Sequence, residues 1–81
     1  MIKNIYAVCI YHNNNITIET NRDAARIKLI RSYLQYQLNS TNLKDSKTTL
    51  TDLYCVFQHD FIPNYGEIKN VYLEEDEQEN D

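Results

Sequence analysis

Residues 2–20 read IKNIYAVCIYHNNNITIET, and their pattern predicts the β-sheet around which the rest of the chain is arranged. Residues 2–11 are nearly continuous in apolar character and rich in Ile, Val and Tyr, which is typical of a strand buried on both faces. The HNNN sequence at residues 12–15 predicts a tight turn, because Asn tolerates the left-handed conformation that such turns require. Residues 16–20 alternate between apolar and polar side chains and predict a second strand. Together the two strands predict an N-terminal β-hairpin.

The segment that follows the hairpin has the period of a helix. Thr20 is the expected N-cap, with Asp23 three residues later reaching back to it, and the helix is expected to run to about Leu38, before the polar NSTN at residues 39–42. Its apolar residues form two stripes on nearly opposite sides. The first consists of Ala24, Ile27, Ile30, Leu34 and Leu38, and the second of Ala25, Leu29, Tyr33 and Tyr36. One stripe should cover the sheet, and the other needs a cover from this chain, a second copy or a partner.

The second half of the chain contains one ambiguous segment. After a polar linker at residues 40–48, residues 49–61 place apolar side chains at helical spacing, and Thr49 and Asp52 sit at capping-box spacing. The YCVF sequence at residues 54–57 instead favours a strand. We interpret the segment as a helix that ends before Pro63, because caps and period agree. Residues 67–73, EIKNVYL, predict a last strand.

These elements predict an α+β fold in which a small antiparallel sheet carries helices on one face, in the order β-β-α-α-β. The alternative order is β-β-α-β-β. Residues 1–73 carry eight Lys+Arg and six Asp+Glu, whereas residues 74–81, EEDEQEND, carry six acids and no base. We therefore expect one compact domain over residues 1–73 and an acidic, disordered tail over residues 74–81.

Composition narrows the classes of function. The chain has one Gly, which excludes glycine-rich phosphate loops, and a body of about 70 residues is marginal enough to favour oligomerisation or a permanent partner. The apolar run near the N-terminus is followed by no small-residue cleavage site, and no stretch approaches the ~18 apolar residues of a membrane span. We expect a cytoplasmic protein with reduced thiols, in the host cell cytoplasm if the gene belongs to a phage.

The two Cys and two His residues form two short pairs. Cys9-x2-His12 and Cys55-x3-His59 contain the ligand types that tetrahedral zinc prefers. However, positions three apart on a strand point to opposite faces, so Cys9 and His12 would converge only if the strand broke at His12. A Cys-His nucleophile would need a third orienting group, and no local signature supplies one. We predict no metal, no cofactor and no enzymatic activity.

Four cations lie within ten residues of the predicted first helix: Arg22, Arg26, Lys28 and Arg31. Nearby tyrosines could supply surfaces on which bases stack, and stacking beside positive charge is how single strands are bound. A nucleic-acid-binding regulator, with the acidic tail modulating its binding, is therefore the alternative function. The weak net charge of the body argues against it, because nucleic-acid modules are usually far more basic.

Our leading prediction is a small, non-enzymatic protein-binding module. The chain has ten Asn, nine Ile and seven Tyr, whose AT-rich codons are common in phages and mobile elements of low-GC bacteria. We expect it to inhibit or redirect a host protein or protein–nucleic-acid complex by steric occlusion, as anti-CRISPR and other anti-defence proteins do, and to form a homodimer through the first helix. The predicted apolar anchor is Ala25, Leu29, Tyr33 and Tyr36, and the tail residues Glu74, Glu75, Asp76 and Glu77 would steer binding electrostatically.

Overall fold

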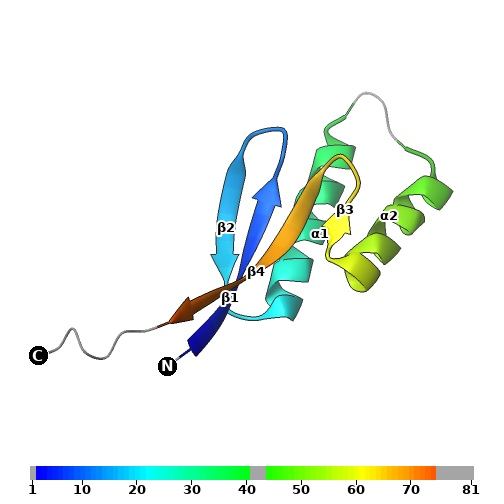
Figure 1. The fold of residues 1–81 in the computed structure, drawn as a ribbon. Helices are drawn as coiled ribbons and strands as arrows, with labels where there is room; N and C mark the ends of the chain where they lie inside the picture. The colour runs from blue at the N-terminus through cyan, green and yellow to red at the C-terminus, as the bar shows by residue number, and fades with distance from the viewer. Residues whose placement is uncertain (1, 41–43, 75–81) are drawn as a thin grey trace, which may run out of the picture.

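Four antiparallel strands form one sheet, in the order β2-β1-β4-β3 (Figure 1). The computed structural model describes residues 2–40 and 44–74. Its elements are β1 (Ile2–Ile10), β2 (Asn15–Glu19), α1 (Arg22–Leu38), α2 (Ser46–His59), β3 (Phe61–Ile62) and β4 (Gly66–Glu74). The predicted α+β class with a small antiparallel sheet is confirmed. The alternative with a third strand in place of the second helix is wrong, because the segment that contains YCVF is α2.

The N-terminal hairpin forms as predicted, with β1 and β2 paired from Tyr6↔Glu19 to Ile10↔Asn15. Asn14 adopts a positive φ of 55°, and the Asn15 amide donates to the Asn13 side-chain oxygen at 2.9 Å. The run of three asparagines therefore makes the turn by the means expected from its composition. On its other side β1 pairs with β4 along its whole length, which makes β1 a central strand.

Helix α1 begins one residue later than a Thr20 cap would require. The Asn21 side chain is the N-cap, and its oxygen accepts a hydrogen bond from the Ala24 amide at 2.7 Å. Thr20 and Asp23 therefore do not form the predicted capping pair. Asn is at least as good a cap as Thr, which explains why the helix starts from the second of two adjacent capping residues.

Helix α2, in contrast, starts three residues earlier than predicted, at Ser46 instead of Thr49. Asp45 is its N-cap and accepts from the Thr48 amide at 2.7 Å, so the Thr49 and Asp52 pair is not a capping box. The helix ends at His59, and its C-cap Asp60 adopts the left-handed conformation with φ 61°. Because the chain reverses direction at Asp60, Phe61 and Ile62 pair with β4 as the two-residue strand β3. The sequence did not predict this strand.

The last strand, β4, extends the prediction by one residue at each end. Glu74 is paired with Ile2 in the register of the sheet, so the ordered strand passes the predicted domain boundary after residue 73. Gly66, the one glycine of the chain, crosses very close to β1. A Cβ at Gly66 would lie 2.6 Å from the Cys9 carbonyl oxygen and 3.0 Å from Leu29 Cδ1, which explains why this position has no side chain.

The core lies between the sheet and the two helices. Helix α1 packs across β1, β2 and β4, while α2 contacts α1 and β3 (Figure 1). The buried residues that form one cluster are Val8, Ile10, Ala25, Leu29, Tyr33, Val56, Ile62, Tyr65 and Ile68. Across the described residues, no helix combines the length and the apolar character that a membrane span requires.

Candidate functional surfaces

The predicted apolar anchor on α1 is mostly core. Ala25 and Leu29 are fully buried, and Tyr33 is 1% exposed, all within the cluster beneath the sheet. These three residues cannot contact a partner while the domain is folded, so their assignment as a protein-binding surface is wrong. Tyr36, the fourth member, remains half exposed at the end of the same stripe. The first apolar stripe of α1 is the outer one, and its Ile27, Leu34 and Leu38 are exposed.

A buried polar network fastens α2 to α1. The Tyr33 hydroxyl donates to Asp52 at 2.6 Å and accepts from the Gln37 amide at 3.0 Å. Lys44 Nζ donates to the same Asp52 carboxylate at 2.8 Å. Burial, and then the hydrogen bond to Asp52, raises the pKa of Tyr33, while the hydrogen bond to Asp52 raises the pKa of Lys44. Among the described residues, every buried side-chain nitrogen or oxygen has a hydrogen-bond partner, so this network has the structural role of fixing how α2 packs on α1.

The four predicted cations of α1 separate into two pairs with different surroundings. Arg26 Nε lies 2.9 Å from Asp60 Oδ1, and Arg22 Nε lies 3.5 Å from Asp60 Oδ2. The Arg22 guanidinium also lies 5.5 Å from the centre of the Tyr6 ring. Both arginines are therefore engaged within the domain. Lys28 and Arg31 have no ion-pair partner among the described residues.

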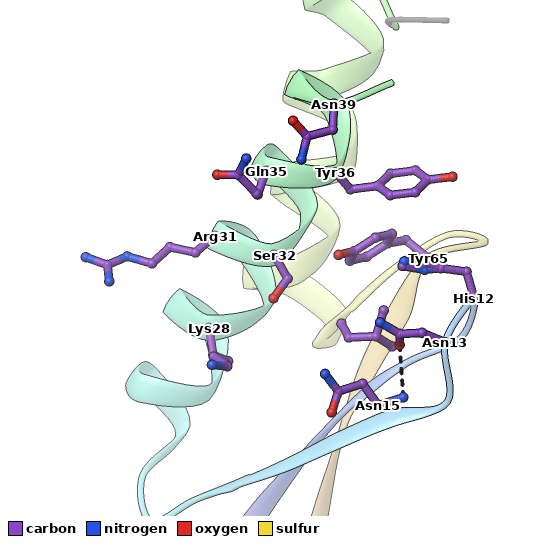
Figure 2. A pocket seen from close by; sticks show the side chains of 11 residues that line it. His12, Asn13, Asn15, Lys28, Arg31, Ser32, Gln35, Tyr36, Asn39 and Tyr65 are labelled. Carbon is purple, nitrogen blue, oxygen red and sulfur yellow. Dashed lines mark hydrogen bonds between the residues drawn. The ribbon is translucent and has the colours of Figure 1, made fainter. Parts of the chain in front are cut away.

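Lys28 and Arg31 line a cleft of about 520 Å³ between the hairpin turn and α1 (Figure 2). The hairpin contributes His12, Asn13 and Asn15 to this cleft. None of the described residues that line it is Asp or Glu. The cleft therefore has a positive local charge and many amide groups that donate and accept hydrogen bonds.

Aromatic rings gather at one end of this cleft, where the hairpin turn meets α1 (Figure 2). The His12 and Tyr36 rings meet edge to face with centroids 4.8 Å apart, and Tyr65 lies 5.5 Å from Tyr36 and 5.4 Å from Tyr33. Tyr65 is buried at the base of the group, and burial raises its pKa. The buried ring supports Tyr36, which is the ring of the group that stays open to solvent on α1.

The open face of the sheet carries exposed apolar side chains, which local patterns in the sequence did not predict. Thr17 is paired with Val8 and therefore faces the helices, so Ile16 and Ile18 point to the opposite side. They are 61% and 54% exposed. Val71 and Leu73 of β4 lie on the same face and are also exposed. The alternation in residues 16–20 predicted this strand, but it did not say which side of the strand the helices would cover.

Helix α2 also carries apolar side chains that nothing in the described chain covers. Leu50, Tyr54 and Phe57 are exposed and follow one another at helical spacing. They lie on the side of α2 away from its buried residues Asp52 and Val56. The domain therefore presents exposed apolar groups on both its sheet and its helices.

The predicted thiol and imidazole residues do not form a site. Cys9 lies in β1, His12 in the hairpin turn beside Tyr36, Cys55 in α2, and His59 at the end of α2 beside Phe61. Within residues 2–40 and 44–74, no group of three or more His, Cys, Asp or Glu side chains is placed to hold a metal ion. The four residues of the hypothetical zinc site are thus not brought together.

The predicted steering residues fall at the limit of the described chain. Glu74 ends β4, and Glu75, Asp76 and Glu77 lie outside the described residues. Comparison of the chain with protein-family models, with curated proteins and with solved structures finds no match.

Proposed function

We propose that this protein is a non-enzymatic protein-binding module whose contact surface is the open face of its sheet. The observation that carries the proposal is the orientation of β2, which turns Ile16 and Ile18 away from the helices and toward solvent. An antiparallel sheet that leaves one face to water normally has polar side chains on that face. The inverted pattern supports a partner that covers it.

The apolar groups form one continuous strip across three strands. In the register, Ile18 lies opposite Ala7, Ile16 lies opposite Cys9, and Val71 lies opposite Ile5. Directly paired residues share a face and have adjacent side chains, so Ile5, Ala7 and Cys9 of β1 connect the apolar residues of β2 with those of β4. Exposed apolar patches of this kind mark interaction surfaces in soluble proteins.

At the hairpin end of the same face, the surface has a hollow and two charged side chains that a partner could contact. A hollow of about 200 Å³ lies there, between Ile16, Tyr11, Glu67 and neighbouring side chains. Glu67 Oε2 and Lys69 Nζ, 3.4 Å apart, provide polar groups at the margin of the apolar strip. An apolar centre with a polar margin and a hollow for an anchoring side chain is the usual anatomy of a protein interface.

The identity of the partner stays a prediction from composition: a host factor that the protein inhibits or redirects, or a second copy of the chain. If the protein forms a homodimer, we expect the open face of the sheet, and not Leu29 and Tyr33 of α1, to make the contact. Two copies related by a twofold axis could place Glu67 of one opposite Lys69 of the other.

The test replaces Ile16 and Ile18 together by Thr, which keeps the branched side chains that favour a strand and removes apolar area. The control replaces Ile27 and Leu34 by Thr, because these residues are also exposed but lie on α1. Sedimentation equilibrium of the free protein and binding to the captured host partner are measured for both variants. We expect the strand variant to lose association with an unchanged circular dichroism spectrum, and the helix variant to retain it.

Loss of association in the helix variant, with the strand variant unaffected, would assign the contact to the helices and contradict the proposal. A wild-type protein that is monomeric and captures no partner would also contradict it.

A further inference from the structure

We propose that the cleft between the hairpin turn and α1 binds a nucleoside phosphate, either as a free nucleotide or within a single strand of nucleic acid. This inference does not depend on the proposed function, since the cleft lies on the helix side of the sheet and the apolar strip on the other. The cleft unites the three properties that such a ligand requires. They are positive charge with no counter-charge among the described residues, an exposed aromatic ring, and amide groups.

The described residues do not neutralise the charge of the cleft. Arg22 and Arg26 share Asp60, and Lys44 and Lys69 are paired with Asp52 and Glu67. Lys28 and Arg31 have no such partner within the described chain, although they occupy the same helix as Arg22 and Arg26. Two unpaired cations in a lining that includes no described carboxylate favour an anionic ligand.

The aromatic end of the cleft is built in advance. Tyr36 is 49% exposed, and its ring meets the His12 ring edge to face and lies 5.5 Å from the buried Tyr65 ring. A ring that is already supported loses little conformational freedom when a base stacks on it. Because every base has a π-face, such a platform accepts different bases.

The positions along α1 suit one ligand that contacts both groups. Lys28 and Tyr36 are eight residues apart, which is about 12 Å of helix rise, and Arg31 lies between them at the rim. In Figure 2 the Arg31 guanidinium extends outward from α1, while Ser32 and Tyr36 lie toward the hairpin. The long Arg31 side chain can reach a phosphate in the cleft by rotation, and a guanidinium matches phosphate oxygens with two parallel hydrogen bonds.

Amide side chains complete the site on both walls. Asn15 lies on the hairpin, Gln35 lies on α1 and Asn39 is the C-cap of α1, and all three line the cleft. They can donate to and accept from the edge of a base or the hydroxyls of a sugar. The cleft volume of about 520 Å³ falls within the range of about 300–1,000 Å³ typical of small-ligand sites.

The experiment measures binding to the full chain by titration calorimetry and by amide chemical shifts, with adenosine 5′-monophosphate, adenosine and inorganic phosphate as probes. We expect the monophosphate to bind more tightly than either of its parts, and all binding of charged probes to weaken with salt. The amide shifts should move at residues of the cleft, including Asn15, Ser32 and Tyr36. Failure of the monophosphate to bind at millimolar concentration, or shifts confined to other surfaces, would overturn the proposal.

Three variants assign the contacts. Lys28→Gln and Arg31→Gln should each weaken the monophosphate about tenfold, because each removes a charge-assisted contact. Tyr36→Leu should weaken it at least about fivefold while leaving inorganic phosphate unchanged. Lys47→Gln removes a cation from α2, away from the cleft, and should have no effect. Equal weakening by Lys47→Gln and by the cleft variants would show nonspecific charge attraction and contradict the proposal.

A second titration separates the two sources of the ligand, using a ten-nucleotide single strand and a ten-base-pair duplex at the same salt concentration. A single strand that binds more tightly than the monophosphate, with the same response to Tyr36→Leu, identifies nucleic acid as the source. A single strand that binds no better identifies a free nucleotide. A duplex that binds as tightly as the single strand would contradict stacking on Tyr36, because its bases are already stacked.

Discussion

Asp52 shows how a single buried charge organises this small domain. Among residues 3–40 and 44–73 it is the one charged residue that is buried, and it binds both the Tyr33 hydroxyl and Lys44. An unpaired carboxylate in this position would be costly, so the two partners make the position tolerable and fix how α2 meets α1. The sequence had given Asp52 a role at the start of the helix, whereas the carboxylate lies one turn further on and points inward.

This network predicts that stability falls at alkaline pH. The pKa of Tyr33 is raised above 10.0 and that of Lys44 above 10.5, so the folded chain keeps both protons to a higher pH than the unfolded chain does. The stabilisation is therefore complete below pH 10 and is lost as the pH rises above it. Burial raises the pKa of Tyr65 as well, with the same sign. Urea denaturation between pH 7 and pH 11 should show this decline.

Tyr33→Phe should reduce the decline and, at neutral pH, lower the free energy of unfolding by about 1–3 kcal/mol through loss of its hydrogen bonds. Tyr54→Phe removes an exposed hydroxyl and is the matched control. An equal decline in Tyr33→Phe and in the wild-type protein would show that Tyr33 does not contribute to it.

At the scale of elements, the ends of the two helices depend on short polar side chains. Asn21 and Asp45 each accept a hydrogen bond of 2.7 Å from the amide three residues later. The Asp45 carboxylate has a lowered pKa because of its hydrogen bonds to Thr48. Each cap is adjacent in sequence to another residue type that can also cap a helix. The local sequence therefore predicts the start of each helix only to within a few residues.

The cap assignment gives a direct test. Asn21→Ala should lower the free energy of unfolding by about 1 kcal/mol, because the Ala24 amide loses its acceptor. Thr20→Ala, at the position that the sequence favoured, should change it by less than about 0.5 kcal/mol. Chemical denaturation of both variants measures the difference. A larger loss of unfolding free energy in Thr20→Ala than in Asn21→Ala would show that Thr20 is the N-cap.

Most elements could be predicted from local patterns, and the one that could not was too short to have a pattern. The hairpin, both helices and the last strand follow from periodicity and turn residues. Strand β3 contains only Phe61 and Ile62, and Phe61 also fits the helical spacing of the preceding residues. Asp60 separates α2 from β3 by its left-handed backbone conformation. Arg22 and Arg26 hold Asp60 in place by pairing with its carboxylate.

For the whole molecule, the difficult question was which side of each element faces inward. Both stripes of α1 are apolar, and β2 has apolar side chains on one side only. Which stripe of α1 and which side of β2 become buried depends on how the helix and the sheet pack against each other. The structure buries the Leu29 stripe and leaves Ile27 and Ile18 in solvent. Local periodicity cannot make this choice, because it depends on how the elements pack. For the same reason, the sequence grouped four cations that the structure divides between Asp60 and the cleft.

The two stripes of α1 can be distinguished by one charged substitution in each. Leu29 is fully buried and Ile27 is 54% exposed, although both are apolar residues on the same helix. Leu29→Glu would place an unpaired charge in the core, at a cost of several kcal/mol against a total stability of about 5 kcal/mol for a domain of this size.

We therefore expect Leu29→Glu to be unfolded at 25 °C, and Ile27→Glu to be folded with a free energy of unfolding close to that of the wild-type protein. Far-ultraviolet circular dichroism and heteronuclear amide spectra separate the two outcomes. A folded, monomeric Leu29→Glu protein would mean that Leu29 contacts a second copy in solution, as the sequence first suggested. It would also mean that α1 is rotated about its axis relative to its orientation in the structure, with Ile27 and Leu34 facing the sheet.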